Sequence, residues 1–442
     1  MRDLKEILTS LIQLRCVNDP DRGVRPSEEC VNGFKRILGE NNFRYREIVS
    51  NGFHSFMSIR GSGKPIIMLM AHYDVVPPGP SWTKKPFEPI EENGRLYGRG
   101  ALDDLSNIAV MLRVSQEIDE ILREVRGTVI ICFTGDEEIG GSNGALVIRE
   151  LLLREGLRPD YLINGDGGGL VIINRRRNAF RLSVKIKPRI LRVRGREINR
   201  RYELQSMYRH SAYFLSGADI HPLIRLARDI ESENLLLSGL RGSFVKSNVL
   251  PEYVEADMVV EDGSGEEVSV DINLTRLVLS LIPLTRLLIE PDFPSVYGVT
   301  ATPNVYKFDG VYHQIDIDIR APLGLSGRVK LDKYVSIILK EYLPEALYEI
   351  HGGNGYLDTP RDSILVKRAL EILERLRLKP VVAEKAGASD SRYFSPLGIQ
   401  SIDIGPIGGG AHGPDEYVEL WSLNVLERFY IEIIKTLLGE KS

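Results

Sequence analysis

Cysteine is scarce in this sequence. Only Cys16, Cys30 and Cys132 occur among 442 residues, and their spacing is irregular. An odd number of cysteines at unrelated spacings argues against a disulfide framework, and the lack of a CxxC pair argues against a thiolate metal site. We therefore expect the three thiols to form neither, and we predict a location in the reducing cytoplasm.

Long apolar runs are also missing. No window approaches the roughly 18 uncharged apolar residues that a membrane helix needs. The longest apolar stretch in the second half, residues 277–289, is interrupted by Pro283 and Arg286. The first residues lack the continuous apolar segment of a signal peptide. We expect no membrane span, no membrane partner and no secretory signal.

The sequence has no excess of one charge, because its formal net charge is -4. Nucleic acid is therefore not an expected partner. Two segments depart from this balance: residues 175–201 contain twelve Lys/Arg and one acid, Glu197, whereas residues 251–272 contain eight Asp/Glu and no Lys/Arg. We interpret the acidic segment as a hairpin, and the basic run as its counterpart or as the lining of an entrance for an anionic substrate. Nucleic-acid binding by the basic run stays a minor alternative, since no aromatic residues or known motif accompany it.

The length and the pattern of apolar residues predict two domains. At 442 residues, of which 43% are hydrophobic, the chain is long for a single domain. Apolar runs at 66–71, 128–133 and 160–164 alternate with helical patterns, which favours an α/β layer with a largely parallel sheet. The composition changes near residue 175, and the α/β pattern returns late in the chain. We predict an α/β catalytic domain formed by residues 1–177 and 356–442, interrupted by an inserted α+β domain at residues 178–355.

Metal-competent side chains follow three of the predicted strands. His72, Glu138 and Asp166 each come shortly after an apolar run, and ligands gather at the carboxyl ends of parallel strands. Asp74 lies two residues after His72, so both side chains face the same side and the Asp74 carboxylate can accept the imidazole N–H. A buried His–Asp pair without a metal, and a solvated acidic turn at residues 136–138, stay open as alternatives.

A glycine-rich turn and a late loop add further candidate ligands. Asp103 lies in the turn at residues 98–104, and His412 lies in the loop at residues 408–414. Together the candidate ligands provide nitrogen and oxygen atoms that suit zinc or a similar divalent ion. Five ligands are too many for one open tetrahedral site, and they suit two metals that share a bridging carboxylate. The set is His72, Asp103, Glu138, Asp166 and His412.

Several segments resemble the zinc-dependent amidohydrolase and carboxypeptidase family that includes succinyl-diaminopimelate desuccinylase, acetylornithine deacetylase, aminoacylase and the bacterial glutamate carboxypeptidase. They cover most of the chain outside residues 233–300. The matching segments are MLMAHYDVVPPG, LYGRGALDDLSN, FTGDEEIGGSNG, NGDGGG, TPNVY with DIDIRAP, AGASDSRYF and GGGAHGPDEYV.

The resemblance implies a zinc-exopeptidase-like α/β/α catalytic domain with two Zn²⁺, for which Co²⁺ can substitute. One metal would be held by His72, Asp103 and Asp166, and the other by Asp103, Glu138 and His412, so that Asp103 bridges them. Glu137 would be the general base that takes a proton from the attacking water and delivers it to the leaving nitrogen. Asp74 would orient His72. A cis peptide is expected between Asp103 and Asp104.

For the inserted domain, the resemblance implies a lid that also forms a homodimer. His210 would reach the active site of the partner subunit and help to stabilise the oxyanion. Asn304 and Arg320 would contact the substrate, and Arg392 is a further candidate for binding a carboxylate. The chain departs from the family at Leu105 and Ser106, where a lysine and a glycine are common, and in the added material of the basic and acidic segments.

These observations together predict a cytoplasmic two-zinc hydrolase. Its substrate would be an N-acyl amino acid or a short peptide, cleaved at an amide bond next to a free carboxylate, so a deacylase, a dipeptidase and a carboxypeptidase all stay possible. The alternative from another class is an inactive relative that binds a ligand or a partner protein through the enlarged lid. The complete ligand set argues against that alternative.

Overall fold

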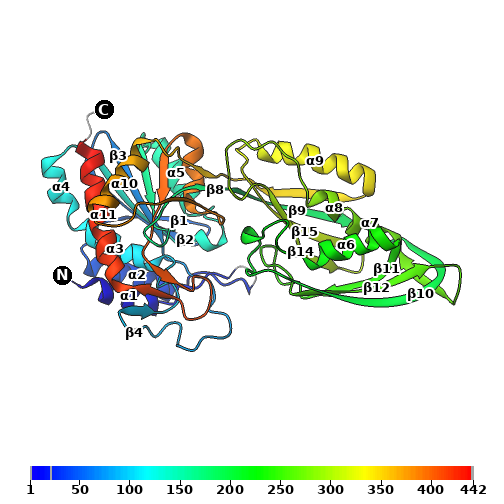
Figure 1. The fold of residues 1–442 in the computed structure, drawn as a ribbon. Coiled ribbons are helices and arrows are strands. Elements are labelled where there is room, and N and C mark those ends of the chain that lie inside the picture. The colour runs from blue at the N-terminus through cyan, green and yellow to red at the C-terminus, as the bar shows by residue number, and fades with distance from the viewer. Residues whose placement is uncertain (1, 20–21, 440–442) are drawn as a thin grey trace. The chain divides into compact units, whose positions relative to one another are not determined.

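The structure is a computed structural model that describes residues 2–19 and 22–439. The chain forms two compact units (Figure 1). The first unit spans residues 1–176, 357–385 and 389–442, and the second spans residues 177–356 and 386–388. The second unit is therefore an insertion in the sequence of the first.

A nine-stranded mixed sheet forms the centre of the first unit, in the order β1-β2-β6-β3-β7-β19-β8-β17, with β18 paired to β8. Its middle is parallel: β3 (Ile66–His72) lies between β6 (Gly127–Thr134) and β7 (Tyr161–Asn164), and β19 (Gln400–Asp403) continues beside β7. The other strands are β1 (Arg46–Ser50), β2 (Phe53–Ser62), β8 (Ile172–Arg176), β17 (Leu357–Asp358) and β18 (Val382–Lys385).

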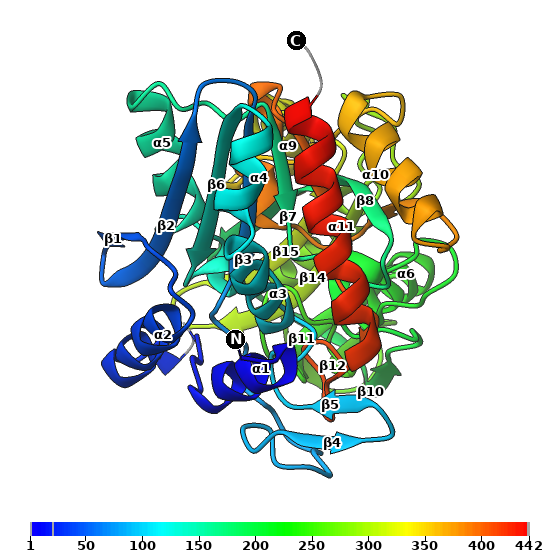
Figure 2. The ribbon, with the colours of Figure 1, turned by 90° about the vertical axis from the view of Figure 1, so that its left-hand side faces the viewer.

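Both faces of this sheet are covered, which explains why β3 and β6 are buried at every position and mostly apolar. Ile67 and Leu69 of β3 enter the larger core cluster, whereas Met68 and Met70 enter a smaller one with α5. Figure 2 shows α3 and α11 lying across the face of the larger cluster. The helices are α1 (Leu4–Gln13), α2 (Glu28–Glu40), α3 (Leu105–Ser115), α4 (Ile118–Glu124), α5 (Ala145–Arg154), α10 (Ile364–Arg375) and α11 (Leu420–Gly439), with the 3₁₀ turns η2 (Glu137–Ile139), η4 (Asp390–Tyr393) and η5 (Ser395–Leu397).

A small four-stranded sheet joins two distant parts of the first unit. It has the order β20-β21-β5-β4, and β21 pairs antiparallel with β5. This pairing brings the loops that carry Asp103 and His412 together. The strands are β4 (Ile90–Glu92), β5 (Arg95–Tyr97), β20 (Gly408–Gly409) and β21 (Tyr417–Glu419).

The cysteines correct one expectation. Cys16 and Cys30 form a disulfide, and Cys132 is free and buried in β6. The sequence spacing did not reveal this pair because the cysteines meet through the packing of α2 against the segment after α1. Disulfides are typical of oxidising compartments, so the argument from cysteine usage for a cytoplasmic location no longer holds. As a separate observation, every helix among the described residues is too short or too polar to span a bilayer.

The second unit contains two four-stranded antiparallel sheets with helices packed against them. One sheet has the order β14-β15-β9-β16 and the other the order β11-β12-β10-β13. Its elements are β9 (Asn178–Ile186), β10 (Ile190–Glu203), η3 (Ser211–Tyr213), α6 (Pro222–Glu233), β11 (Leu235–Gly242), β12 (Tyr253–Glu261), β13 (Glu267–Asp271), α7 (Ile272–Leu279), α8 (Leu281–Leu284), β14 (Thr300–Phe308), β15 (His313–Ala321), α9 (Gly327–Tyr342) and β16 (Leu347–Gly352).

The predicted acidic hairpin is wrong. Its two strands, β12 and β13, both pair antiparallel with the basic strand β10 instead. Their opposite charges explain this arrangement, because Arg201 lies 3.0 Å from Glu255 and Arg192 lies 3.8 Å from Glu267. The basic run therefore does serve as the counterpart of the acidic segment, as one of the two interpretations proposed.

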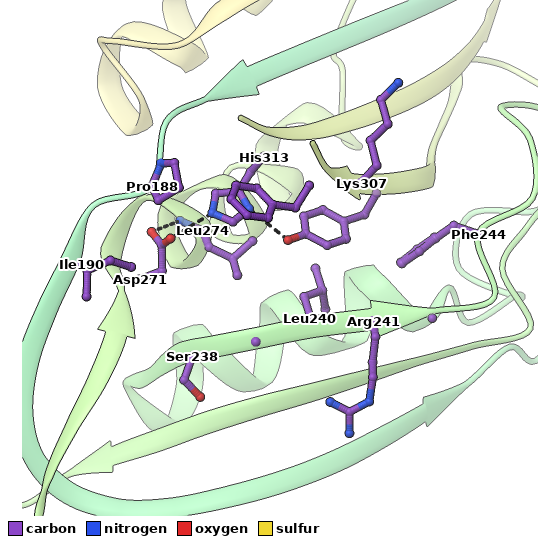
Figure 3. Close-up of a pocket in the computed structure, with 14 residues that line it drawn as sticks. Pro188, Ile190, Ser238, Leu240, Arg241, Phe244, Asp271, Leu274, Lys307 and His313 are labelled. Atoms are coloured by element: carbon purple, nitrogen blue, oxygen red, sulfur yellow. Dashed lines mark hydrogen bonds and ion pairs between the residues drawn. The ribbon is translucent and has the colours of Figure 1, made fainter. Parts of the chain in front are cut away.

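A cavity of about 570 Å³ lies within the second unit, and a buried polar chain forms part of its wall (Figure 3). His313 Nε2 lies 2.9 Å from Asp271 Oδ2, and His313 Nδ1 lies 2.9 Å from the Tyr306 hydroxyl. Asp271 also caps α7 by accepting the amide N–H groups of Asn273 and Leu274. These contacts tie the start of β15 to the start of α7.

Candidate metal centre

His72 is the last residue of β3, and its ring is buried at the carboxyl end of the sheet. Its Nδ1 lies 2.9 Å from the carbonyl oxygen of Asp74 and 3.4 Å from Asp74 Oδ1. Both are acceptors, so Nδ1 carries a proton and Nε2 is the nitrogen that a metal could take. Nε2 points at Asp103, with its Oδ1 3.1 Å away. The nearer acceptor is thus the backbone of Asp74, while the sequence had suggested its carboxylate.

Asp103 lies between the two histidines. Its Oδ1 faces His72, and its Oδ2 lies 3.2 Å from Nε2 of His412. The peptide bond between Asp103 and Asp104 is cis, which confirms the expectation drawn from the resemblance. A carboxylate with one oxygen toward each imidazole has the geometry that a bridging ligand needs.

His412 and Glu138 complete the convergence. His412 is presented by a loop in which it adopts a positive φ of 60°, and its Nε2 lies 3.1 Å from Glu138 Oε1. His72, Asp103 and Glu138 each offer one ligand atom, and these atoms all lie within 4.8 Å of one another. Imidazole nitrogen and carboxylate oxygen at this spacing fit a divalent cation such as zinc.

The histidines and carboxylates of this centre shift one another's pKa values. Burial opposes a charged His72, yet hydrogen bonds to Asp103 and Asp74 raise its pKa well above the usual value. The Glu138 carboxylate raises the pKa of His412 in the same way. The two histidines in turn overcome the burial of Asp103 and hold the pKa of that carboxyl well below its usual range. A bound cation would take over the role of these protons.

Asp166 follows β7, and its carboxylate faces two cations of the first unit. Asp166 Oδ1 lies 3.1 Å from Arg176 Nη2 and 3.5 Å from Lys385 Nζ. The tight group of ligand atoms contains His72, Asp103 and Glu138 but not Asp166. Of the five predicted ligands, the structure therefore brings four into direct contact, and it places Asp166 beside them with its carboxylate turned to Arg176 and Lys385.

Glu137 begins the η2 turn directly after Asp136, next to the candidate ligand Glu138. Burial raises the pKa of its carboxyl well above the usual value, and the negative charge of Asp166 adds to this shift. A carboxylate with a raised pKa is a stronger base than an ordinary one. Glu137 is therefore a candidate base of this site.

Arg392 lies in η4 beside Asp390, with Nη2 3.9 Å from Asp390 Oδ1. Its Nε and Nη2 are buried and donate no hydrogen bond to any group in residues 2–19 and 22–439. Burial raises the pKa of Asp390 to about 7 and that of Asp136 to about 6. A buried guanidinium with free N–H donors can bind a carboxylate from outside the protein.

Glu416 is a residue that the sequence analysis missed. Its buried carboxylate accepts the amide N–H groups of Gly100, Leu102 and Asp103, and it forms an ion pair of 2.5 Å with Arg99. Glu416 therefore joins the turn that carries Asp103 to the loop that carries His412. Its place four residues after His412 was the only signal available, and no local pattern distinguishes it.

The remaining predicted residues belong to the second unit. His210 caps η3, where its Nδ1 accepts the amide N–H of Ala212. Asn304 is fully buried, and its Nδ2 donates to the carbonyl oxygen of Ser247 at 2.6 Å. Arg320 donates to Asp318 at 2.9 Å.

Comparisons with known proteins agree with this geometry. The sequence model of peptidase family M20/M25/M40 matches residues 68–436. A succinyl-diaminopimelate desuccinylase from Thioalkalivibrio sulfidiphilus is 24% identical over the full length of both chains (100% of each). Among solved structures, an aminoacylhistidine dipeptidase from Vibrio alginolyticus superposes with a TM-score of 0.72 at 15% identity, covering 99% of this chain and 97% of its own. An M20 family metallo-carboxypeptidase from Sulfolobus solfataricus has a TM-score of 0.64 at 18% identity and covers 99% and 100%.

Proposed function

The chain belongs to peptidase family M20/M25/M40 and is a metallohydrolase of that family, and we propose that it uses two Zn²⁺ ions to cleave an amide bond next to a free carboxylate. The observation that carries the proposal is the meeting of His72, Asp103 and Glu138, whose ligand atoms all lie within 4.8 Å of one another. His412 contacts two of these three residues. With Asp103 as the shared ligand, Asp166 would complete the first metal position and His412 the second.

Glu137 carries the proton in the proposed reaction. When bound, a pair of divalent cations polarises the amide carbonyl and makes water a better nucleophile. The Glu137 carboxylate takes a proton from water as the oxygen–carbon bond forms. It then delivers that proton to the nitrogen as the carbon–nitrogen bond breaks. The products are a carboxylic acid and an amine. Asp74 keeps His72 in the tautomer whose Nε2 faces the site.

The substrate we propose is an N-acyl amino acid or a short peptide. The free donors of Arg392 support this class, because a guanidinium in a buried position suits the carboxylate of an amino acid. Asn304 and Arg320 are proposed as further substrate contacts and His210 as an oxyanion donor, all from the second unit. A lid histidine that serves the active site of a partner subunit requires a dimer. We therefore propose a homodimer formed through the second unit. The Cys16–Cys30 disulfide removes the support for a cytoplasmic location.

Removal and return of the metal test the proposal. The purified protein is treated with a chelator, and hydrolysis is measured on N-acetyl amino acids, N-succinyl amino acids and dipeptides before and after Zn²⁺ or Co²⁺ is added. We expect activity to be lost with the chelator and to return with either metal, at a stoichiometry of two ions per chain. Hydrolysis that survives complete removal of metal would contradict the proposal. Zinc bound without hydrolysis of any of these substrates would favour the inactive relative.

A further inference from the structure

The segment after α1 runs beside the end of β3 and pairs with the residues that follow His72. Val17 forms a parallel bridge with Val75. Two backbone hydrogen bonds hold this contact, from Val75 N to the Cys16 carbonyl at 3.0 Å and from Asn18 N to the Val75 carbonyl at 2.9 Å. Asn18 is thereby fixed next to Asp74, and its side chain is only 2% exposed.

The Asp74 carboxylate is fully buried and joins several parts of the centre. Oδ1 accepts the amide N–H of Glu137 at 3.2 Å, and Oδ2 accepts the amide N–H of Glu138 at 3.2 Å. Oδ2 also accepts the Nδ2–H of Asn18 at 2.9 Å, which is the shortest of these contacts. One carboxylate thus holds the backbone of both glutamates and lies 3.4 Å from His72 Nδ1, and Asn18 is the further side chain that donates to it.

We propose that Asn18 is a positioning residue of the metal centre and that the Cys16–Cys30 disulfide anchors it. This inference rests on the proposed function. Cys30 lies in α2, so the disulfide attaches the segment at residues 16–18 to the helical layer, and the segment in turn presents Asn18 to Asp74. Groups that hydrogen-bond directly to metal ligands commonly change metal affinity by about 10- to 100-fold when they are removed. Asn18 acts one step further out, through Asp74, so we expect an effect at the lower end of that range.

The chemistry of the amide explains why this residue type suits the position. The Asn18 Nδ2 is a neutral donor, so it satisfies a lone pair of Asp74 without neutralising its charge. The negative charge of Asp74 therefore stays available to the His72 imidazole. An ionised aspartate at position 18 has almost the same shape but offers no donor, and its charge would repel Asp74.

The direct test compares Asn18→Asp and Asn18→Leu with the wild-type protein. Zinc affinity is measured by competition with a chromophoric chelator, the visible spectrum of the Co²⁺-loaded protein reports ligand geometry, and Tm reports folding. We expect zinc affinity to fall by about 10-fold in both variants, the lower end of the range for direct partners of ligands, with a changed Co²⁺ spectrum. Asn18→Asp keeps the shape of the side chain, so it carries the test if Asn18→Leu does not fold.

Asn41→Ala is the matched control. Asn41 is also a 2% exposed asparagine of the first unit, and its Nδ2 donates to the Ile37 carbonyl at the end of α2. We expect this variant to lower Tm while its zinc affinity and Co²⁺ spectrum stay those of the wild type. Wild-type zinc affinity in Asn18→Asp would overturn the inference while leaving the proposed function intact. If the wild-type protein itself bound no divalent metal, the proposed function would fail instead.

The role of the disulfide is tested with the double variant Cys16→Ala, Cys30→Ala, and Cys132→Ala is its control because Cys132 is buried without a disulfide. We expect the double variant to bind zinc more weakly than the wild type, by a smaller factor than Asn18→Leu, and the Cys132→Ala variant to bind it equally well. A double variant with a lower Tm but wild-type zinc affinity would show that the disulfide stabilises the fold only, and would overturn this part of the inference.

Discussion

Each unit contains a buried histidine–carboxylate pair. The two pairs differ in the group that the other ring nitrogen of the histidine contacts. In the first unit, His72 Nδ1 faces Asp74, and in the second unit, His313 Nε2 faces Asp271. The burial is alike: His72 is 2% exposed and His313 is 6% exposed. On the other nitrogen, however, His72 meets the Asp103 carboxylate, whereas His313 meets the Tyr306 hydroxyl.

The difference explains why one pair is a candidate ligand and the other is not. Tyr306 can donate its hydroxyl hydrogen to His313. The group formed by Asp271, His313 and Tyr306 therefore satisfies its own hydrogen bonds without a bound cation. His72 lies among acceptors that only a proton or a cation can satisfy together. A buried histidine–carboxylate pair therefore indicates a metal site when its free nitrogen faces further carboxylates, as at Asp103 and Glu138, and a structural link when it faces a neutral donor.

Glu137→Gln should give the largest effect, because only the first pair lies beside a candidate base. The glutamine keeps the size of the side chain and cannot accept the proton. We expect kcat to fall by about 100- to 10,000-fold, while two metal ions still bind. Steady-state kinetics with N-acyl amino acids and dipeptides, together with metal analysis, provide the measurement.

The control for Glu137→Gln is the same chemical change in the second pair, Asp271→Asn. It removes a buried carboxylate that accepts from His313 and from the start of α7, so we expect a lower Tm and an unchanged kcat below that Tm. An active Glu137→Gln enzyme would contradict the role of Glu137. A strong loss of kcat in Asp271→Asn would contradict the distinction between the pairs.

His72→Leu and His313→Leu should separate metal binding from stability. Removing a ligand should lower zinc affinity more than removing an outer partner, so we expect a loss of more than about 100-fold in His72→Leu. In His313→Leu, Asp271 loses its imidazole donor, and we expect the free energy of unfolding to fall by about 1–3 kcal/mol with unchanged zinc affinity. Calorimetric zinc titration and chemical denaturation measure the two quantities. Equal zinc affinities in the two variants would show that His72 is not a ligand.

The parts of the centre that were predicted from sequence are those with a local pattern. His72 and Glu138 follow apolar strands of a predicted parallel sheet, and the resemblance added the loops of Asp103 and His412. The α/β layer and the family are confirmed, since the whole chain superposes on structures of this kind. A side chain at the carboxyl end of a strand has few places to point, and for this reason its position could be inferred.

The residues that hold these ligands could not be predicted in the same way. Asn18 meets Asp74 across 56 residues, and Glu416 meets Asp103 across 313. Each is a single polar residue whose partner is chosen by tertiary packing, so no period or spacing marks it. The Cys16–Cys30 disulfide and the pairing of β12 and β13 with β10 were missed for the same reason. The roles of His210, Asn304 and Arg320 stay predictions.

The two pairs should also respond to opposite ends of the pH range. The pKa values of His72 and His412 are raised by neighbouring carboxylates, so the stability they give to the metal-free protein is present below about pH 6.5 and is lost as pH rises through the raised pKa values. The pKa of Asp271 is lowered by His313 and by backbone donors, which outweigh its burial. Its stabilisation is present above about pH 3.9 and is lost as pH falls through the lowered pKa.

Zinc must displace protons from His72 and His412, so binding should release protons at pH 7. Calorimetric zinc titrations in two buffers with different heats of ionisation measure this release directly. We expect the apparent binding enthalpy to depend on the buffer, and zinc affinity to rise with pH above about 6.5. Both effects should persist in His313→Leu. Binding without proton release would mean that His72 and His412 are neutral in the metal-free protein.

Tyr306→Phe should have the smallest effect. Burial raises the pKa of Tyr306 to about 12, so the hydroxyl stays protonated and donates to His313 at ordinary pH. The variant removes this hydrogen bond, yet Tyr306 is half-buried at the wall of the cavity, where water can replace the lost hydroxyl. We therefore expect a loss at the lower end of about 0.5–1.5 kcal/mol in unfolding free energy, measured by denaturation. In Tyr348→Phe, whose hydroxyl donates to Asp332 at the exposed surface, the loss should be smaller still. Neither variant should change zinc affinity, because the neutral donor on its second ring nitrogen makes His313 a structural residue. Weaker zinc binding in Tyr306→Phe would contradict the structural role of the second pair.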